Sequence, residues 1–224
     1  MLSRNTYLEI NLKNIKNNIR KLLRYYDEFE YYFGVVKADC YGQSGIKVVK
    51  TIIESGCNYL AVATLDEALD IRKKIEDIPI LCLGVVSSQY IETCIQNNIT
   101  ITVNSLEYLE EILAQDCEQL KVHLKINTGM NRLGIDKREE VKRAVQMIKS
   151  QHIMLEGIYT HIYDASAKET YLKQIELFKQ LVQDIDLSQI PIVHIAASEA
   201  LTKYEKPDFV NRLPFRNYYV WVYR

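Results

Sequence analysis

Residues 32–64 read YFGVVKADCYGQSGIKVVKTIIESGCNYLAVAT, and this stretch contains the repeating unit of the fold. The runs 32–39 and 59–64 are almost continuously apolar, which is typical of strands covered on both faces in a parallel sheet. Between them, residues 45–56 place apolar side chains at the spacing of an amphipathic helix. The stretch therefore predicts a strand, a helix and a second strand.

The same alternation continues along the chain. Further strands are expected at residues 80–86, 99–104, 120–128, 155–162 and 192–198, and further helices at 65–75, 105–115, 138–151 and 169–185. In the last helix the spacing of Leu172, Ile175, Phe178 and Leu181 marks one buried face. An eighth strand would fall at 208–215. This count predicts an α/β fold of the (β/α)8 TIM-barrel type, although a doubly wound sheet has the same local pattern.

The composition excludes several classes of protein. The 224 residues are 48% hydrophobic and 25% charged, with a formal net charge of −1 and no basic block, so we expect no nucleic-acid partner. No apolar run of about 18 residues occurs, and we expect no membrane segment. The five cysteines are widely spaced without a CxxC pair, which predicts no metal site and a cytoplasmic location.

Residues with reactive or phosphate-binding side chains gather where the predicted strands end. The group comprises Lys37, Tyr41, Asn104, Asn127, Thr128, Arg132, Thr160, His161, His194 and Ser198. In a barrel this edge carries the active site. The group lacks the carboxylate pair of glycosidases and the HExxH pair of metalloproteases. A reactive lysine among such donors favours Schiff-base chemistry.

Each of these residues also has a structural interpretation. Lys37 can be an ordinary strand-end lysine, and His161 and His194 can be core histidines with satisfied hydrogen bonds. Gly42 can serve the turn alone, and Ser198 can cap a helix. The residues taken singly leave these alternatives open.

Several motifs together resemble the barrel domain of alanine racemases, which are pyridoxal-phosphate enzymes. The segment VVKADCYGQS resembles the family's VVKANAYGHG, and LKINTGMNRLGI resembles LKVDTGMNRLGI. GIYTHI is similar to GIFTHF, and HIAASEAL to HxANSAA. The resemblance runs from residue 7 to about Phe209, with Gln43 and Asn127 in place of the commoner histidine and aspartate. We therefore expect residues 1–211 to form the barrel and 212–224 a divergent tail.

The resemblance implies pyridoxal 5′-phosphate as cofactor and assigns residues to it. Lys37 would form the internal aldimine, Tyr41 would lie near the phosphate, and Ser198 would donate to it. Arg132 would contact the phenolic oxygen, and His161 would pack near the ring. His194 would join the hydrogen-bond network beneath the ring. Arg212 or Arg216 would contact the ring nitrogen, with the choice left open.

The resemblance also implies a reaction. Lys37 would act as base on one face of the α-carbon in two-base racemisation of L-alanine to D-alanine, with serine as the other substrate considered. His161 would support the opposite acid/base, while Arg132 and the backbone of Met130 would bind the substrate carboxylate. Lys125 matches a lysine that is carbamylated in many relatives and supports the arginine.

The end of the chain departs from the family pattern. Relatives continue into a C-terminal β-domain that supplies the opposite-face tyrosine across a homodimer, and this chain stops at Arg224. No glycine follows Gly157, so one expected phosphate contact lacks its residue. A truncated or frame-shifted racemase, inactive alone, is the resulting hypothesis, with a naturally shortened chain as its competitor. A non-catalytic pyridoxal-phosphate carrier and an inert product are the alternative functions.

Overall fold

The seven described strands form one curved parallel sheet. The computed structural model describes residues 8–26, 30–43, 45–196, 203–204 and 207. The strands are β1 (Phe33–Val35), β2 (Tyr59–Val62), β3 (Ile80–Cys82), β4 (Ile99–Val103), β5 (Lys121–Lys125), β6 (Met154–His161) and β7 (Ile192–Ala196). They pair in chain order from β1 to β7. A doubly wound sheet reverses its strand order at a switch point, so the unbroken order confirms the TIM-type barrel. The expected eighth strand lies outside the described residues.

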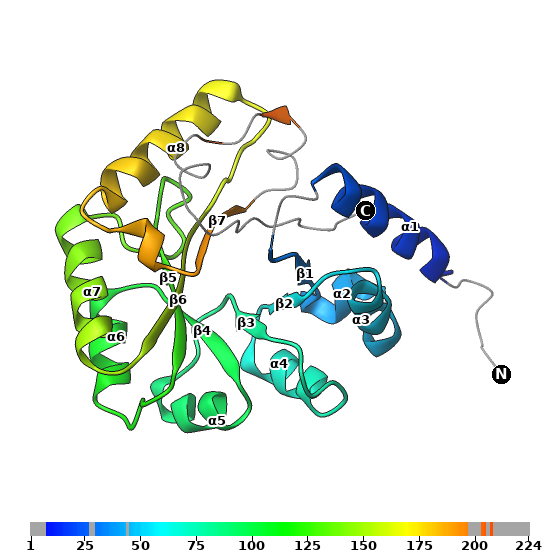
Figure 1. Cartoon of the computed structure of the whole chain (residues 1–224), viewed down its shortest axis with the longest axis horizontal. Helices are drawn as coiled ribbons and strands as arrows, with labels where there is room; N and C mark the ends of the chain where they lie inside the picture. Colours follow the sequence, from blue (N-terminus) through cyan, green and yellow to red (C-terminus); the bar gives the residue numbers. More distant parts are fainter. Residues whose placement is uncertain (1–7, 27–29, 44, 197–202, 205–206, 208–224) are drawn as a thin grey trace.

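Helices surround the strands (Figure 1). They are α1 (Leu12–Tyr25), α2 (Lys37–Gly42), α3 (Gly45–Glu54), α4 (Leu65–Arg72), α5 (Ile91–Gln96), α6 (Leu106–Leu113), α7 (Arg138–Ser150) and α8 (Lys168–Val182), with the 3₁₀ turns η1 (Ser88–Tyr90) and η2 (Leu187–Gln189). Side-chain caps begin several of them: Asn11 caps α1, Ser105 caps α6, and Thr64 with Glu67 forms a capping box on α4. Such caps satisfy backbone N–H groups that the first helical turn leaves unpaired.

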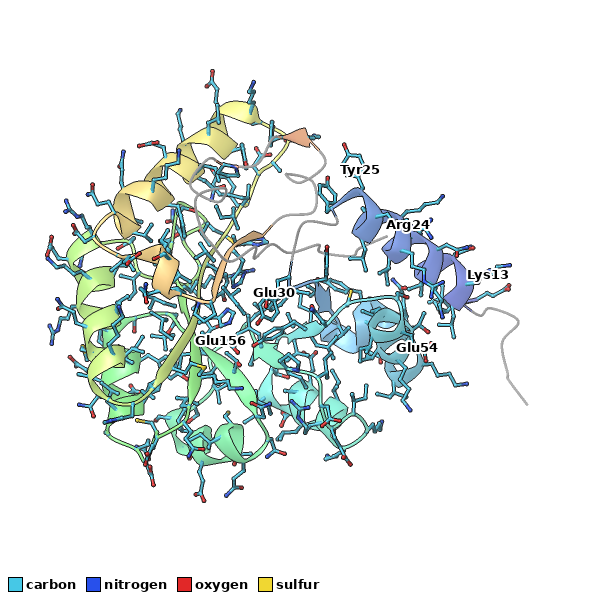
Figure 2. The ribbon with its side chains drawn as sticks, viewed as in Figure 1. Lys13, Arg24, Tyr25, Glu30, Glu54 and Glu156 are labelled. Atoms are coloured by element: carbon cyan, nitrogen blue, oxygen red, sulfur yellow. The ribbon has the colours of Figure 1, made fainter. Side chains whose placement is uncertain are left out.

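Most buried apolar side chains belong to an outer and an interior core, as expected for a barrel, and a further small cluster contains Ile162, Ala165, Tyr171 and Ile175. The outer core lies between the strands and the helices and includes Leu60, Ile101 and Phe178. The interior core lies inside the sheet and includes Phe33, Tyr59, Ala61, Leu81 and Ile192. In Figure 2, Glu156 lies within the ring of strands, whereas Lys13 and Arg24 project from α1 at the rim. A largely buried carboxylate inside a barrel needs compensating hydrogen-bond or ionic partners.

Two local expectations differ from the structure. On α8 the buried face contains Tyr171 and Gln174, whereas Leu172 is 50% exposed. The prediction for Leu172 was wrong because Tyr171, one position earlier, packs at the same end of the helix and stacks on Tyr204. No helix was predicted at α1 or between β3 and β4, where the structure has η1 and the short α5.

The described helices include none that is both long enough and apolar enough to cross a membrane. The structure describes all five cysteines, and each is buried with a free thiol.

Candidate active site at the carboxyl ends of the strands

Lys37 follows β1 and starts α2, whose backbone is a left-handed turn and not a regular α-helix. Ala38, Asp39, Cys40 and Tyr41 all have φ between +51° and +57°, a left-handed conformation that costs about 1–2 kcal/mol per residue for side chains other than glycine. Gly42 and Gly45 continue with positive φ, as expected for them. The turn brings the Lys37 Nζ to 5.7 Å from the centroid of the Tyr41 ring. The structure thus brings Lys37 and Tyr41 together at this edge.

Glu67, from the first turn of α4, braces the left-handed turn. Its Oε1 accepts a hydrogen bond of 2.7 Å from the backbone N–H of Ala38, and its Oε2 accepts from Ala63 (2.7 Å) and Thr64 (3.3 Å). The backbone N–H of Cys40 donates to the Val36 carbonyl. These contacts offset part of the conformational cost, since strained backbone persists only where its surroundings hold it.

Lys125, at the end of β5, forms a cationic cluster with Lys37 and Arg132. Burial, followed by the nearby charges of Arg132 and Lys37, lowers the pKa of Lys125 to about 8. Its Nζ lies 5.4 Å from the centroid of the Tyr159 ring. Lys125 thus lies near two other cationic groups, and an anion beside it would relieve the repulsion.

The loop after β5 carries Arg132 and Met130. The Asn127 Oδ1 accepts from the backbone N–H groups of Gly129 (3.1 Å) and Asn131 (3.0 Å), so Asn127 holds the loop as an Asx turn. Its amide donates to the Asn131 side chain. The Arg132 side chain is exposed and that of Met130 is half-buried. The asparagine that replaces the commoner aspartate can therefore build this turn.

His161 ends β6 and is half-buried, beside a buried polar group that joins β5, β6 and α8. The Gln174 amide donates to the Thr128 hydroxyl (2.9 Å) and to the His161 carbonyl (3.2 Å). The Thr128 and Thr160 hydroxyls are 2.7 Å apart, and the Tyr163 N–H donates to Gln174. Gln174 thus fixes the backbone at His161.

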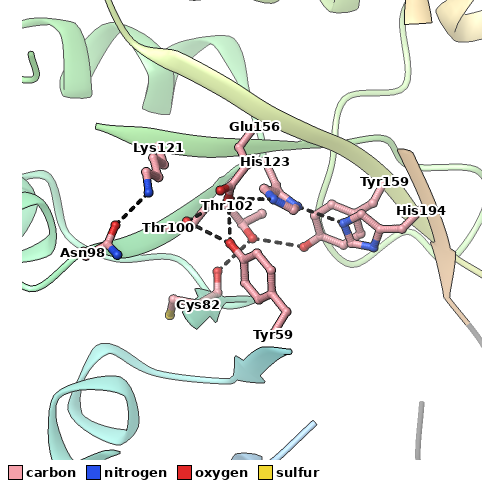
Figure 3. Close-up of polar contacts among 10 residues, drawn as sticks. All are labelled: Tyr59, Cys82, Asn98, Thr100, Thr102, Lys121, His123, Glu156, Tyr159 and His194. Carbon is pink, nitrogen blue, oxygen red and sulfur yellow. Dashed lines mark hydrogen bonds and ion pairs between the residues drawn. The ribbon is translucent and has the colours of Figure 1, made fainter. Parts of the chain in front are cut away.

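A buried hydrogen-bond network fills the interior of the sheet (Figure 3). The Glu156 Oε2 accepts from the hydroxyls of Tyr59 (2.6 Å) and Thr100 (2.9 Å) and lies 3.2 Å from the His123 Nε2. The His123 Nδ1 lies 2.9 Å from the His194 Nε2. The His194 ring stacks on that of Tyr159, with centroids 4.2 Å apart. His194 is therefore connected to the Glu156 carboxylate through His123.

Two irregularities of β6 permit this network. The register with β5 passes from Val122–Leu155 to His123–Gly157, so Glu156 is the extra residue of a β-bulge. The bulge interrupts the alternation and places Glu156 among interior residues, an effect typical of bulges. A Cβ on Gly157 would lie 2.7 Å from the His123 ring, so only glycine fits here.

The surroundings shift the pKa values of this network. Burial alone would raise the pKa of Glu156, but hydrogen bonding and charge from His123, with the hydroxyls of Tyr59 and Thr100, outweigh burial and lower it to about 2. Burial lowers the pKa of His194 well below its usual range, and the charges of His123 and Lys125 act in the same direction. Glu156 is therefore ionised and His194 neutral near pH 7.

The remaining predicted site residues are either outside the described part of the chain or lack a contact that assigns them a role. Ser198, Arg212 and Arg216 lie outside the described residues. The Asn104 Oδ1, at the end of β4, is buried without a hydrogen-bond partner among the described residues. Behind the turn a cavity of about 240 Å³ is lined by Asp39, Glu67 and Asp70, against Lys74. This acidic lining does not suit a phosphate.

Sequence reasoning missed His123, Glu156 and Tyr59. His123 and Lys125 are two residues apart in an otherwise apolar strand, so period-two spacing could have placed both in the interior. The position of Glu156 could not be predicted from this spacing, because the β-bulge turns its side chain to the interior face of the sheet. In the described part of the chain, no group of three or more His, Cys, Asp or Glu residues is arranged to hold a metal ion.

The comparisons with known proteins agree with this geometry. The family described as "Alanine racemase, N-terminal domain" matches residues 10–212. The alanine racemase of Halalkalibacterium halodurans is 36% identical over 214 residues, which is 92% of this chain and 55% of that protein. The chain thus spans about half the length of the curated relatives it matches.

Solved structures show the same fold. The alanine racemase of Bacillus anthracis, solved with bound L-Ala-P, is 28% identical and superposes with a TM-score of 0.86 over 99% of this chain and 58% of that one. That of E. faecalis is 30% identical, with a TM-score of 0.82 over 94% and 57% of the two chains. By its fold, its motifs and these matches, the chain belongs to the family of alanine racemase N-terminal domains.

Proposed function

We propose that this chain forms the cofactor-binding barrel of a pyridoxal-phosphate-dependent alanine racemase, which interconverts L-alanine and D-alanine. The cluster of Lys37, Lys125 and Arg132 at the carboxyl ends of the strands carries the proposal. Alanine is preferred to serine because the related enzymes reported above are named alanine racemases. The homodimer that the resemblance implies, with a tyrosine from the second copy, stays a prediction.

The residues present fit this cofactor. A phosphate-bearing aldehyde needs an amine to hold it and positive charge to balance its phosphate and phenolate. Lys37 offers the amine. The positive charges of Lys125 and Arg132, which repel each other, would balance the anionic groups of the cofactor. The Tyr41 side chain, on the turn after Lys37 and 42% exposed, lies where it could contact the phosphate. Ser198 and Arg212 would complete the binding group.

Each residue then has a chemical task. When bound, pyridoxal phosphate supplies an electron-accepting ring that acidifies the α-proton of its amino acid. The Lys37 Nζ would hold the cofactor and move the proton on one face of the α-carbon. The Arg132 guanidinium and the Met130 backbone N–H would donate to the substrate carboxylate. His161, held through its carbonyl by Gln174, would support the acid/base group of the opposite face, while His194 lies in the network of the barrel interior.

Cofactor binding is the first test. Titration of the purified chain with pyridoxal phosphate should give a protein-bound absorbance band that borohydride fixes to Lys37. Lys37→Ala should abolish the band, and Lys50→Ala, an exposed lysine of the neighbouring α3, should leave it unchanged. An equally strong band in Lys37→Ala would overturn the assignment.

Racemisation of L-alanine is the second test. D-alanine formation should depend on added cofactor and should fall by at least about 10²-fold in Lys37→Ala, since general acid–base groups contribute about 10²–10⁴-fold. The assay is run on this chain and on a version that extends to the full length of the relatives. Cofactor binding without turnover in both forms would favour the carrier function instead.

A further inference from the structure

The interior network links a carboxylate at the amino-terminal half of β6 to a histidine of β7. Glu156, His123 and His194 are joined by contacts of 3.2 and 2.9 Å, and both histidines are buried. The Phe33 ring stacks on Tyr59, with centroids 3.9 Å apart, and Phe33 lies 5.8 Å from His194. Packed aromatic rings hold the imidazoles in place, so the network has one arrangement and few ways to relax.

The hydrogen bonds of the network determine where the protons of His123 and His194 lie. An ionised carboxylate only accepts hydrogen bonds, so the His123 Nε2 carries a proton in every state of the network. The hydrogen bond between the His123 Nδ1 and the His194 Nε2 contains one proton, which one of the two nitrogens donates. If His123 is neutral, that proton belongs to the His194 Nε2, and the His194 Nδ1 is an acceptor. If His123 is cationic, its own Nδ1 donates, and neutral His194 carries its proton on Nδ1 as a donor.

We propose that Glu156 and His123 are positioning residues whose charge state decides which nitrogen of His194 carries the proton. A proton taken up by His123 is thereby converted into a change of tautomer at His194, with no charge appearing on His194. Sequence-distant residues of β5 and β6 thus set the hydrogen-bonding character of a residue on β7.

The groups around His123 bear on this equilibrium from each neighbouring strand. The Glu156 carboxylate lies 3.2 Å from the His123 Nε2, and Lys125 lies two residues along β5. Tyr59 and Tyr159 are neutral near pH 7, because burial raises the pKa of both phenols. Tyr59 also donates to Glu156, which disperses the carboxylate charge and weakens its pull on His123.

The relay is a property of the folded chain, and its meaning for catalysis rests on the proposed function. In a racemase, His194 would either accept from or donate to the group between it and the cofactor ring. The hydrogen bonding of that ring would then depend on His123, a residue that does not touch the cofactor.

Nitrogen-15 NMR of the chain labelled at histidine tests the proposal directly, since bare and protonated ring nitrogens have well-separated shifts. The chain has four histidines, so the spectrum is simple. Whenever the spectrum shows a neutral His123, His194 should be in the Nε2–H form, and whenever it shows a cationic His123, His194 should be neutral and in the Nδ1–H form. Any other pairing of the two rings, or a charged His194, would overturn the relay.

Two conservative variants should change the His194 tautomer in opposite directions. Glu156→Gln removes the negative charge beside the His123 Nε2, so the Nε2–H form of His194 should become more populated at a given pH. Tyr59→Phe keeps the aromatic stack but removes a donor to Glu156, and should favour the Nδ1–H form. Glu118→Gln, which alters an exposed residue in the loop before β5, is the control. Changes of the same sign in both variants would refute the reasoning.

These outcomes separate the relay from the proposed function. A chain that shows the expected pairing of His123 charge and His194 tautomer but binds no pyridoxal phosphate refutes the function and keeps the relay. A chain that binds the cofactor through Lys37 but shows uncoupled histidines refutes the relay alone.

Discussion

Glu67 connects the left-handed turn to α4, and its replacement by glutamine should be as harmful as its removal. Both carboxylate oxygens accept from backbone N–H groups, Oε1 from Ala38 and Oε2 from Ala63 and Thr64. An amide offers one oxygen, so in Glu67→Gln the NH₂ group must face an N–H donor. The variant loses one side of the brace and adds a donor–donor contact.

The contacts set the size of the effect. A hydrogen bond to a charged group contributes about 1.5–3 kcal/mol, and less where water competes. The two bonds of 2.7 Å are partly exposed, and the capping box contributes about 1 kcal/mol. We expect Glu67→Gln and Glu67→Ala each to lower the free energy of unfolding by about 2–3 kcal/mol. At about 2–4 °C per kcal/mol for a chain of this size, Tm should fall by about 5–10 °C.

Chemical denaturation and hydrogen exchange measure this effect globally and locally. The Ala38 amide should exchange faster in Glu67→Gln, and affinity for pyridoxal phosphate should fall because Lys37 precedes that amide. Asp66→Asn alters an exposed charge in the same helical turn and should change stability by less than about 0.5 kcal/mol. A loss below about 0.5 kcal/mol in Glu67→Gln, or an unchanged Ala38 exchange rate, would refute the account of the brace.

Three further predictions concern other described contacts. Arg72 donates to five backbone carbonyls, those of Ile75, Glu76, Ile78, Asn97 and Asn98; Arg72→Lys, with a single donor atom, should cost about 1–3 kcal/mol in urea denaturation. The folded-state pKa of Glu156, about 2, lies below its unfolded value. Its stabilisation is therefore complete above about pH 4.5 and is lost as pH falls toward 2, about 3 kcal/mol in all; in Glu156→Gln this part of the acid dependence should disappear. Gln174→Leu leaves the Tyr163 N–H without its acceptor and should destabilise by about 1–3 kcal/mol, with faster exchange at Tyr163; unchanged exchange would contradict this role.

The alternation of apolar runs and amphipathic segments was enough to predict a parallel α/β fold, and the motif resemblance selected the barrel over a doubly wound sheet. Strands such as β4, buried at all five positions, leave no other place for their side chains than a covered sheet. Lys37 was identifiable because a lysine interrupts an apolar run beside a glycine-bearing turn. The predicted strand ends also placed Arg132 after β5 and His161 at the end of β6, where the structure has them, and the motif resemblance supplied their proposed roles.

The remaining features depend on contacts between distant residues. Local preference disfavours a left-handed conformation at Ala38, which is held by Glu67, 29 positions along the chain. Glu156 enters the interior only because β6 and β5 slip in register. Whether Tyr171 or Leu172 is buried on α8 depends on which side chain has a partner, and Tyr204 provides it.

The left-handed turn has a consequence for the order of folding. Its four residues cost about 4–8 kcal/mol before any contact is made, and the Ala38 bond to Glu67 exists only after β2 and α4 have docked. The turn should therefore form late, after the folding transition state, so substitutions within it should accelerate unfolding and leave the folding rate almost unchanged. The lysine proposed to hold the cofactor would then reach its final position among the last parts of the barrel to do so.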